Sequence, residues 1–156
     1  MKIVVFSDSH GKKTNIDKVL MNLGHETDCV IFLGDGHKDI DDFEALYPNI
    51  RFVKVLGNCD MWEQGLREHV FELAGKRFFI THGHMFYVKN DYDKIIDAAR
   101  EISADICMFG HTHLATVFYD GNILFINPGN IGDRRPYSYG VIEIIDDEIS
   151  ANIAYL

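Results

Sequence analysis

The sequence lacks the features of a disulfide-stabilised or a membrane-spanning protein. It has only three cysteines, Cys29, Cys59 and Cys107, without paired spacing. So sparse and odd a set argues against a disulfide framework and favours a reducing compartment. No apolar run approaches the roughly 20 residues that cross a bilayer, and the run at Met1–Phe6 is too short for a signal peptide. We therefore expect a cytoplasmic protein with no membrane partner.

Prolines are also few, three in 156 residues, and no repeat, low-complexity tract or linker divides the chain. Apolar residues make up 47% of the sequence and charged residues 25%, which is typical of a globular rather than a disordered protein. A chain of this length suits one domain, so we predict a single unit over residues 1–156.

Positive charge is in short supply. Lysine and arginine total 15 against 24 acidic residues, for a formal net charge of -9. This balance repels polyanions at long range, so stable nucleic-acid binding is not expected. A small phosphorylated substrate is still compatible with the charge, because a local cation site can override the global field. Assembly into a homo-oligomer is left open.

One pattern recurs along the chain: a short apolar run followed at once by a polar loop. Runs of this kind, apolar at nearly every position, are typical of strands buried on both faces. The runs and their loops are Lys2–Phe6 before Ser7–His10, Cys29–Leu33 before Gly34–His37, Arg51–Leu56 before Gly57–Asp60, Arg77–Ile80 before Thr81–His84, Ile106–Phe109 before Gly110–His113, and Ile123–Ile126 before Asn127–Asn130.

Apolar periodicity predicts helices between the early runs and hairpins at the end of the chain. The expected helices run from Thr14 or Asn15 to Gly24, over about Asp39–Tyr47, and from Asn90 or Asp91 through Ala99. The expected hairpins pair Ala115–Tyr119 with Asn122–Ile126, and Tyr139–Ile145 with Glu148–Tyr155. This order of elements predicts an α/β (α+β) fold of two packed mixed sheets with helices outside.

Seven residues of metal-ligating type fall just past the ends of these runs, where open α/β sheets hold their ligands. Imidazole, carboxylate and amide oxygen suit Mn, Fe, Zn, Ni or Co. Seven ligands are too many for one tetrahedral ion and fit two divalent ions about 3.5–4 Å apart, with one bridging carboxylate. The seven are Asp8, His10, Asp35, Asn58, His82, His111 and His113.

The charge of such a centre favours one substrate class. Two dications bring four positive charges, Asp8 and Asp35 remove two, and a bridging hydroxide removes one more, which leaves about +1. A singly charged phosphodiester would neutralise this site, so diesters are weakly favoured over monoesters. A phosphomonoesterase or nucleotidase with the same site stays open, and a nuclease for long polymers is disfavoured by the missing basic stripe.

These motifs together resemble one family. Asp8-Ser9-His10, Gly34-Asp35, Gly57-Asn58, His82-Gly83-His84 and Gly110-His111-Thr112-His113 resemble the calcineurin-like metallophosphoesterases in order and approximate spacing. The short chain and its Asn127-Pro128-Gly129-Asn130 segment look like the small single-domain phosphodiesterase branch. The resemblance covers nearly the whole chain and implies a four-layer αββα sandwich.

The resemblance also implies roles for individual residues. Asp8, His10 and His113 would hold one ion, Asn58, His82 and His111 the other, and Asp35 would bridge them. A metal-bridging hydroxide would then attack phosphorus of a small or nucleotide-like phosphate ester.

The sequence departs from the family at one position. Many relatives carry histidine directly after the asparagine, where this chain has Cys59, and a thiol is a poor acid at neutral pH. From loop position, His37 or His84 is expected to protonate the leaving group in its place.

Each motif also has a purely structural interpretation. Asp8 alone reads as a helix cap, Asp35 as a turn former, and the acidic set Asp39, Asp41, Asp42 and Glu44 as a solvated helix face. Arg134 and Arg135 are expected on the surface, although contact with phosphate is conceivable. A further alternative is a non-catalytic scaffold, because this fold also serves as a scaffold subunit in a eukaryotic membrane-sorting complex.

Overall fold

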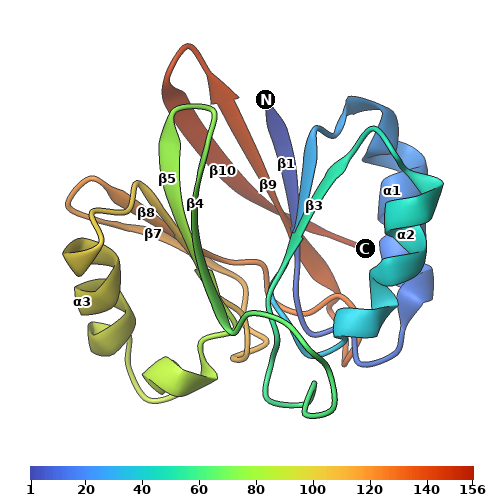
Figure 1. Ribbon diagram of the computed structural model, residues 1–156, viewed down its shortest axis with the longest axis horizontal. Helices are drawn as coiled ribbons and strands as arrows, with labels where there is room; N and C mark the ends of the chain where they lie inside the picture. Colours follow the sequence, from blue (N-terminus) through green and yellow to red (C-terminus); the bar gives the residue numbers. More distant parts are fainter.

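Two mixed β-sheets face each other, and helices cover their outer sides (Figure 1). The computed structural model describes all residues, 1–156. Each sheet has five strands, in the orders β10-β9-β1-β2-β3 and β4-β5-β6-β8-β7. This arrangement is the αββα sandwich that the sequence predicts. None of the helices combines the length and hydrophobicity that crossing a membrane requires.

The elements have the following bounds. The first sheet consists of β1 (Lys2–Phe6), β2 (Cys29–Phe32), β3 (Arg51–Lys54), β9 (Ser138–Ile145) and β10 (Glu148–Tyr155). The second consists of β4 (Glu68–Leu73), β5 (Lys76–Thr81), β6 (Ile106–Met108), β7 (Thr116–Asp120) and β8 (Ile123–Asn127). The helices are α1 (Lys13–Leu23), α2 (Asp41–Leu46) and α3 (Asp93–Glu101), with short 3₁₀ turns η1 (Gly24–Glu26), η2 (His37–Asp39) and η3 (His84–Phe86).

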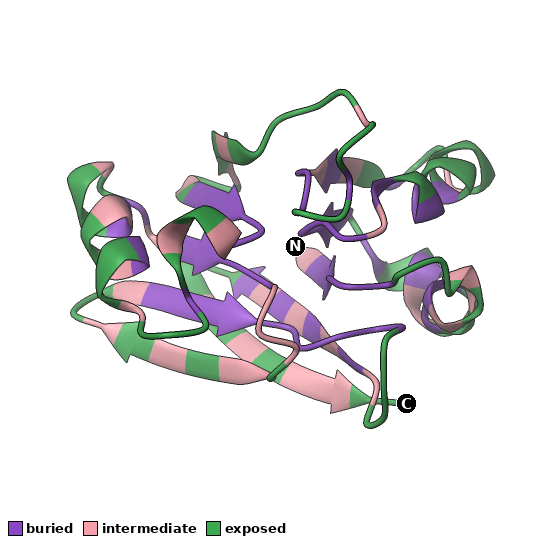
Figure 2. Cartoon of the chain, turned by 90° about the horizontal axis from the view of Figure 1, so that it is seen from below, coloured by how far each residue is buried: buried purple, intermediate pink, exposed green.

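The central core lies between the two sheets. It joins Val5 and Ile31 of the first sheet to Ile80 and Met108 of the second, all fully buried. Burial of these side chains on both sheets is the main force that holds the layers together. Figure 2 shows the consequence, with buried strands in the middle and helices exposed on their outer faces.

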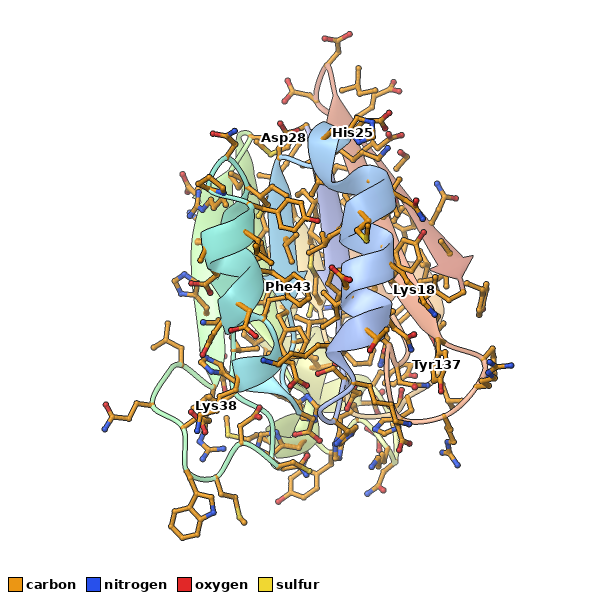
Figure 3. All side chains as sticks on the ribbon, turned by 90° about the vertical axis from the view of Figure 1, so that its right-hand side faces the viewer. Lys18, His25, Asp28, Lys38, Phe43 and Tyr137 are labelled. Atoms are coloured by element: carbon orange, nitrogen blue, oxygen red, sulfur yellow. The ribbon has the colours of Figure 1, made fainter.

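The helices are held by two further apolar clusters. On one side, Leu20 of α1 and Phe43 of α2 pack against Phe6 and Phe32 of the first sheet (Figure 3). On the other side, Ile95 of α3 packs within a cluster on the second sheet. Both clusters follow the apolar periodicity of their helices.

Strand direction is what positions the site. β1, β2 and β3 run parallel to one another, and so do β5, β6 and β8. The carboxyl ends of parallel neighbours meet at the same edge of a sheet. The loops that follow these strands therefore gather at one end of the sandwich, the lower end in Figure 1.

Besides small shifts in the ends of several elements, three details differ from the sequence prediction. β4 was not expected, because it is an edge strand that pairs only with β5 and alternates exposed and half-buried residues. α1 begins at Lys13, before the capping residues that the sequence indicates, and no side chain caps it. Asp39 is not part of a solvated helix face: it lies in η2, is 6% exposed and accepts hydrogen bonds.

Candidate metal centre

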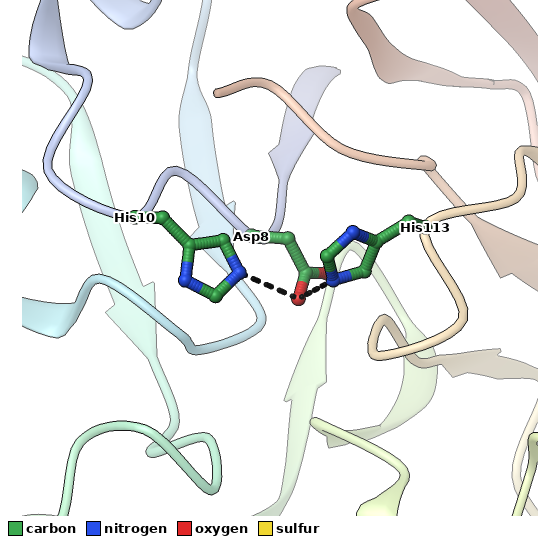
Figure 4. A group of neighbouring side chains, drawn as sticks. All are labelled: Asp8, His10 and His113. Atoms are coloured by element: carbon green, nitrogen blue, oxygen red, sulfur yellow. Dashed lines mark ion pairs between the residues drawn. The ribbon is translucent and has the colours of Figure 1, made fainter. Parts of the chain in front are cut away.

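Six of the seven proposed ligands meet between the two sheets, in two groups. The ligand atoms of Asp8, His10 and His113 lie within 4.8 Å of one another (Figure 4). Those of Asp35, His82 and His111 form a second group by the same measure. Asp8, His10 and Asp35 follow strands of the first sheet, whereas the other three histidines follow strands of the second. Each group therefore draws ligands from both sheets.

The two carboxylates lie at the centre of these groups. Asp8 Oδ1 is 3.1 Å from His113 Nε2 and 3.8 Å from His10 Nε2. Asp35 Oδ2 is 3.4 Å from His82 Nε2 and 3.9 Å from His10 Nε2. Both carboxylates thus face a histidine of each group, since Asp8 Oδ1 also lies 3.9 Å from His82 Nε2. Asp35 is therefore in a position that a bridging ligand could take.

Backbone strain is concentrated in the same residues. Asp8, His10, Asp35, His111 and His113 all have φ between 46° and 65°, in the left-handed region. This conformation costs non-glycine residues about 1 kcal/mol or more each, and it persists only where the surrounding structure enforces it. Its presence at five of the six clustered side chains indicates a functional constraint on these loops.

In His82 and His113, a hydrogen bond at Nδ1 orients the imidazole ring. His82 Nδ1 is 2.7 Å from the Leu33 carbonyl oxygen, and His113 Nδ1 is 2.9 Å from Asp133 Oδ2. Each bond assigns the proton to Nδ1 and leaves Nε2 free to face the carboxylates. Sequence reasoning missed Asp133, because nothing in the pattern links it to a histidine 20 residues away.

Two further buried carboxylates hold the loops in place. Asp60, 8% exposed, accepts backbone hydrogen bonds from Asp35, Gly36, His37 and Gly57 at 2.8–3.0 Å. Burial opposes its charge, yet these N–H donors hold the pKa of Asp60 below its usual range.

Asp39 does the same for the first loop. It accepts from Ser9 Oγ at 2.6 Å and from the Gly11 N–H at 2.7 Å. Asp39 is therefore buried, and not part of a solvated face, because its carboxylate accepts the hydrogen bonds that fix the loop carrying His10.

Gly57 allows the loop after β3 to approach the loop after β2. A Cβ added at Gly57 would overlap both the carboxylate and the backbone nitrogen of Asp35. The Gly57-Asn58 pair therefore passes directly beside Asp35, and the Cys59 N–H donates to Asp35 Oδ1 at 2.7 Å. Only glycine fits at this contact.

The residues present fit a pair of divalent cations. Asp8 Oδ1 and His82 Nε2 are buried and have no hydrogen-bond partner in the protein. No lysine or arginine lies within ion-pairing distance of Asp8 or Asp35, so their two buried charges are met only by histidines. A buried carboxylate oxygen needs hydrogen-bond donors or a compensating cation; Asp8 Oδ1 has no such donor, and oxygen and imidazole ligands suit a transition-metal ion.

In the metal-free state, the clustered carboxylates and histidines influence one another's protonation. Burial opposes the ionisation of Asp35, but His82 and the Cys59 N–H outweigh it and hold the pKa of Asp35 well below its usual range. Burial likewise opposes charge on His82, but Asp35 and Asp8 raise its pKa. Asp8 also raises the pKa of His113. Burial and then the charge of His82 lower the pKa of His111 to about 4.

Metal-induced stabilisation should therefore increase with pH. Because the pKa values of His82 and His113 are raised, their protonation stabilises the metal-free fold below about pH 6.5, and this contribution is lost as the pH rises through their folded-state pKa values. A metal must displace these protons to bind. We expect the rise in Tm on adding Mn²⁺ to be larger at about pH 8 than at about pH 6.

The measurement is differential scanning calorimetry at both pH values, with and without the metal. His25→Gln is the matched control, because His25 is exposed and lies far from the site loops (Figure 3). A Tm increase that is equal at the two pH values, or larger at the lower one, contradicts this expectation.

The remaining predicted site residues have more varied positions. Asn58 is exposed, and its Nδ2 lies 3.3 Å from Cys59 Sγ. The His84 ring is 5.5 Å from that of His82 and 6.1 Å from that of His111, so it borders the second group. His37 is 9% exposed and forms no ion pair; its Nε2 lies beside Gly65, away from the clustered imidazoles.

Relatives in sequence match nearly the whole of this chain. It is 29% identical to the probable metallophosphoesterase YsnB of Bacillus subtilis, over 94% of this chain and 86% of that protein. It is 28% identical to the phosphodiesterase YfcE of Escherichia coli, over 99% of this chain and 98% of that protein.

A similar solved structure and a family model agree with these sequence relatives. A conserved protein of Streptococcus pneumoniae, described as a predicted phosphoesterase, superposes with a TM-score of 0.81 at 31% identity, over 99% of this chain and 88% of that one. Residues 1–147 match the calcineurin-like phosphoesterase superfamily domain. The chain therefore belongs to the calcineurin-like phosphoesterase superfamily.

Proposed function

We propose that this chain is a dinuclear-metal-dependent phosphodiesterase that hydrolyses a small or nucleotide-like phosphate ester. The observation that carries the proposal is the pair of buried carboxylates, Asp8 and Asp35, surrounded by four imidazoles and by no lysine or arginine. Family membership supports the hydrolytic chemistry, and a full-length relative named as a phosphodiesterase supports the ester class. We infer that residues 1–156 act as one unit, because the two sheets share one core.

The proposed ligand sets follow the two groups. Asp8, His10 and His113 would hold one ion, and His82 and His111, with Asn58 from the adjoining loop, would hold the other. Asp35 would lie between the ions. Divalent ions such as Mn, Ni, Zn, Fe or Co supply a nucleophile at neutral pH and polarise the phosphoryl group.

The chain's own residues would order this centre and offset part of its positive charge. Asp35 and Asp8 bring two negative charges, and the Nδ1 hydrogen bonds of His82 and His113 fix where each Nε2 lies. Pre-set geometry of this kind removes the reorganisation cost at the moment of reaction. Because neutral Asn58 replaces a third carboxylate, the centre would stay positive and attract a phosphodiester.

His84 is the better of the two proposed leaving-group residues. It borders the second ligand group, whereas His37 is buried beside Gly65. Burial, with the charges of His82 and Arg67, lowers the pKa of His84, so the neutral ring would donate a hydrogen bond rather than a full proton. Cys59 cannot take this role by ionising, because burial and Asp35 raise its pKa to about 11.

The test is a rate screen beside metal analysis. We expect the purified chain, loaded with Mn²⁺, Ni²⁺ or Zn²⁺, to hydrolyse bis(p-nitrophenyl) phosphate with a higher kcat/KM than p-nitrophenyl phosphate. His84→Ala should slow hydrolysis of an ester with an unactivated alcohol by about tenfold or more, and of the aryl ester by less, because the aryl leaving group needs no donor.

Each other outcome has a definite meaning. Preference for the monoester would replace the proposal with a phosphomonoesterase. A folded protein that stays metal-free and inert with every metal supplied would favour the non-catalytic scaffold. An unchanged rate for His84→Ala on the unactivated ester would remove His84 from the reaction.

A further inference from the structure

A second polar cavity adjoins the candidate metal centre on the His113 side. We name it the basic pocket; it has a volume of about 330 Å³ and is lined by nine residues that include His113, Asn130, Arg134, Arg135 and Tyr155. None of the nine carries a carboxylate side chain. Because His113 is at once a wall of this pocket and a proposed metal ligand, a molecule held at the metal centre can extend into it.

The arginines of the basic pocket are nearly free of acidic partners. Arg135 has no carboxylate within ion-pairing distance, and the only one near Arg134 is Asp133, 3.8 Å from Nε. That same Asp133 oxygen is already 2.9 Å from His113 Nδ1. Several basic side chains elsewhere are paired with carboxylates at closer range; Lys54, for example, lies within 2.7 Å of two carboxylates. In a chain of net charge -9, two guanidinium groups with a single carboxylate nearby, shared with His113, make a local excess of positive charge.

A third cation, Lys12, lies close to the same segment of the chain. Lys12 Nζ donates to the Asp133 carbonyl oxygen at 3.0 Å and lies 6.0 Å from the centre of the Tyr137 ring. Arg135 lies 5.9 Å from the centre of the same ring. Lys12 and Arg135, both exposed, therefore lie close to the same tyrosine ring.

The basic pocket also offers a neutral donor. Asn130 is 3% exposed, and its Oδ1 accepts from the Arg134 N–H at 3.1 Å. Its Nδ2 donates no hydrogen bond within the protein. A buried amide donor beside two guanidinium groups is suited to phosphate oxygens, which accept several charge-assisted bonds at once.

A neighbouring cavity has a different character. It has a volume of about 480 Å³, and its seven lining residues include Lys89, Asp91, Tyr92 and Thr112. There the lysine and the aspartate balance in charge. Leu114 lines both cavities, so the two lie on either side of the loop that carries His111 and His113. A diester at the metals would thus have one arm directed toward net positive charge and the other toward balanced charge.

We propose that the basic pocket binds a second phosphate group, carried on one arm of the ester, and that the enzyme selects diesters that bear such a group. This inference rests on the proposed hydrolytic function and specifies its substrate class. Arg134 and Arg135 take the distal phosphate, Asn130 adds a neutral donor, and the uncharged arm enters the other cavity. The sequence predicted these arginines on the surface and left contact with phosphate open; both are exposed, and both line the cavity beside His113.

The test compares two matched substrates. These are the p-nitrophenyl ester of thymidine 5′-phosphate with a free 3′-hydroxyl, and the same ester with a 3′-phosphate. We expect the wild-type enzyme to prefer the 3′-phosphorylated ester by about tenfold or more in kcat/KM, as charge-assisted contacts to a phosphate would provide. In Arg134→Gln/Arg135→Gln the ratio should fall to about one, and the double lysine variant should retain part of it.

The ratio within each enzyme cancels any general loss of activity or folding. Lys18→Gln is the control for lost charge, since Lys18 lies on the outer face of α1 without an ion pair (Figure 3) and should leave the ratio unchanged. Equal kcat/KM values for both esters in the wild type would overturn the inference, as would a preference that survives in the double glutamine variant. Failure to hydrolyse either ester, or bis(p-nitrophenyl) phosphate, would instead overturn the proposed function itself.

Discussion

Asp35→Asn is expected to lower kcat/KM for a phosphodiester by about a thousandfold or more and to leave the protein short of one bound metal ion. The asparagine has the same shape, and its oxygen can still accept the Cys59 N–H bond. What it lacks is the negative charge that faces both His10 and His82. An amide is a weak ligand and does not bridge two cations, so the two ions would repel each other without compensation.

Metal content per chain, measured by elemental analysis, and steady-state rates check this prediction. The matched control is Asp42→Asn, which removes the same charge from a side chain that is 69% exposed and paired with Lys13 on the helical side. It should change neither metal content nor rate. A full complement of metal in Asp35→Asn, with a rate within a few fold of the wild type, would end the claim that this carboxylate lies between two ions.

Asp60→Ala is expected to lower the free energy of unfolding by about 3 kcal/mol or more and to weaken metal binding by about 10–100-fold. The variant leaves four backbone N–H groups, those of Asp35, Gly36, His37 and Gly57, without their acceptor. Three of them lie in the loop that carries Asp35. Asp60 contacts no proposed ligand side chain, so its effect on metal binding would pass through the backbone.

Urea unfolding in the presence of a chelator isolates the structural part of this effect, and calorimetric titration with Mn²⁺ gives the affinity. Asp60→Asn should fall between the wild type and the alanine variant, because it keeps one acceptor oxygen. Asp41→Ala, which removes a half-exposed carboxylate paired with Lys54, should change stability by less than about 0.5 kcal/mol. Comparable losses in Asp41→Ala and Asp60→Ala would show that the buried hydrogen bonds are not the cause.

Much of the fold could be predicted because its buried strands are apolar at nearly every position. β1 has the bounds that the sequence predicts, and β2, β6 and β8 differ by one residue at an end. β4 escaped prediction because its outer face is solvated and Val70 is 46% exposed, so its pattern is weak. The pairing of β9 with β1 joins residues about 140 positions apart, a contact that local pattern cannot reveal.

The candidate site also contains residues that could be predicted from the sequence and residues that could not. Residues of the ligand type were predictable, since each follows directly on an apolar run, and the structure gathers the six that carry a carboxylate or an imidazole. Asp39, Asp60 and Asp133 were not, because a carboxylate that holds a loop has no signature in composition or spacing. Such residues can be found only once the folded backbone shows which N–H and imidazole groups they face. The choice of His84 over His37 likewise needed the position of each ring.

Neither sheet carries a complete ligand group: each group combines residues after β1 or β2 with residues after β5 or β6. An ion held by such a group is a cross-link between the two halves of the sandwich, and the halves cannot separate without releasing it. Metal supply would then govern how long the folded chain survives as well as how fast it works. Digestion by a protease with and without a chelator measures that dependence directly, and equal rates of digestion would show that the halves stay together without help from the ions.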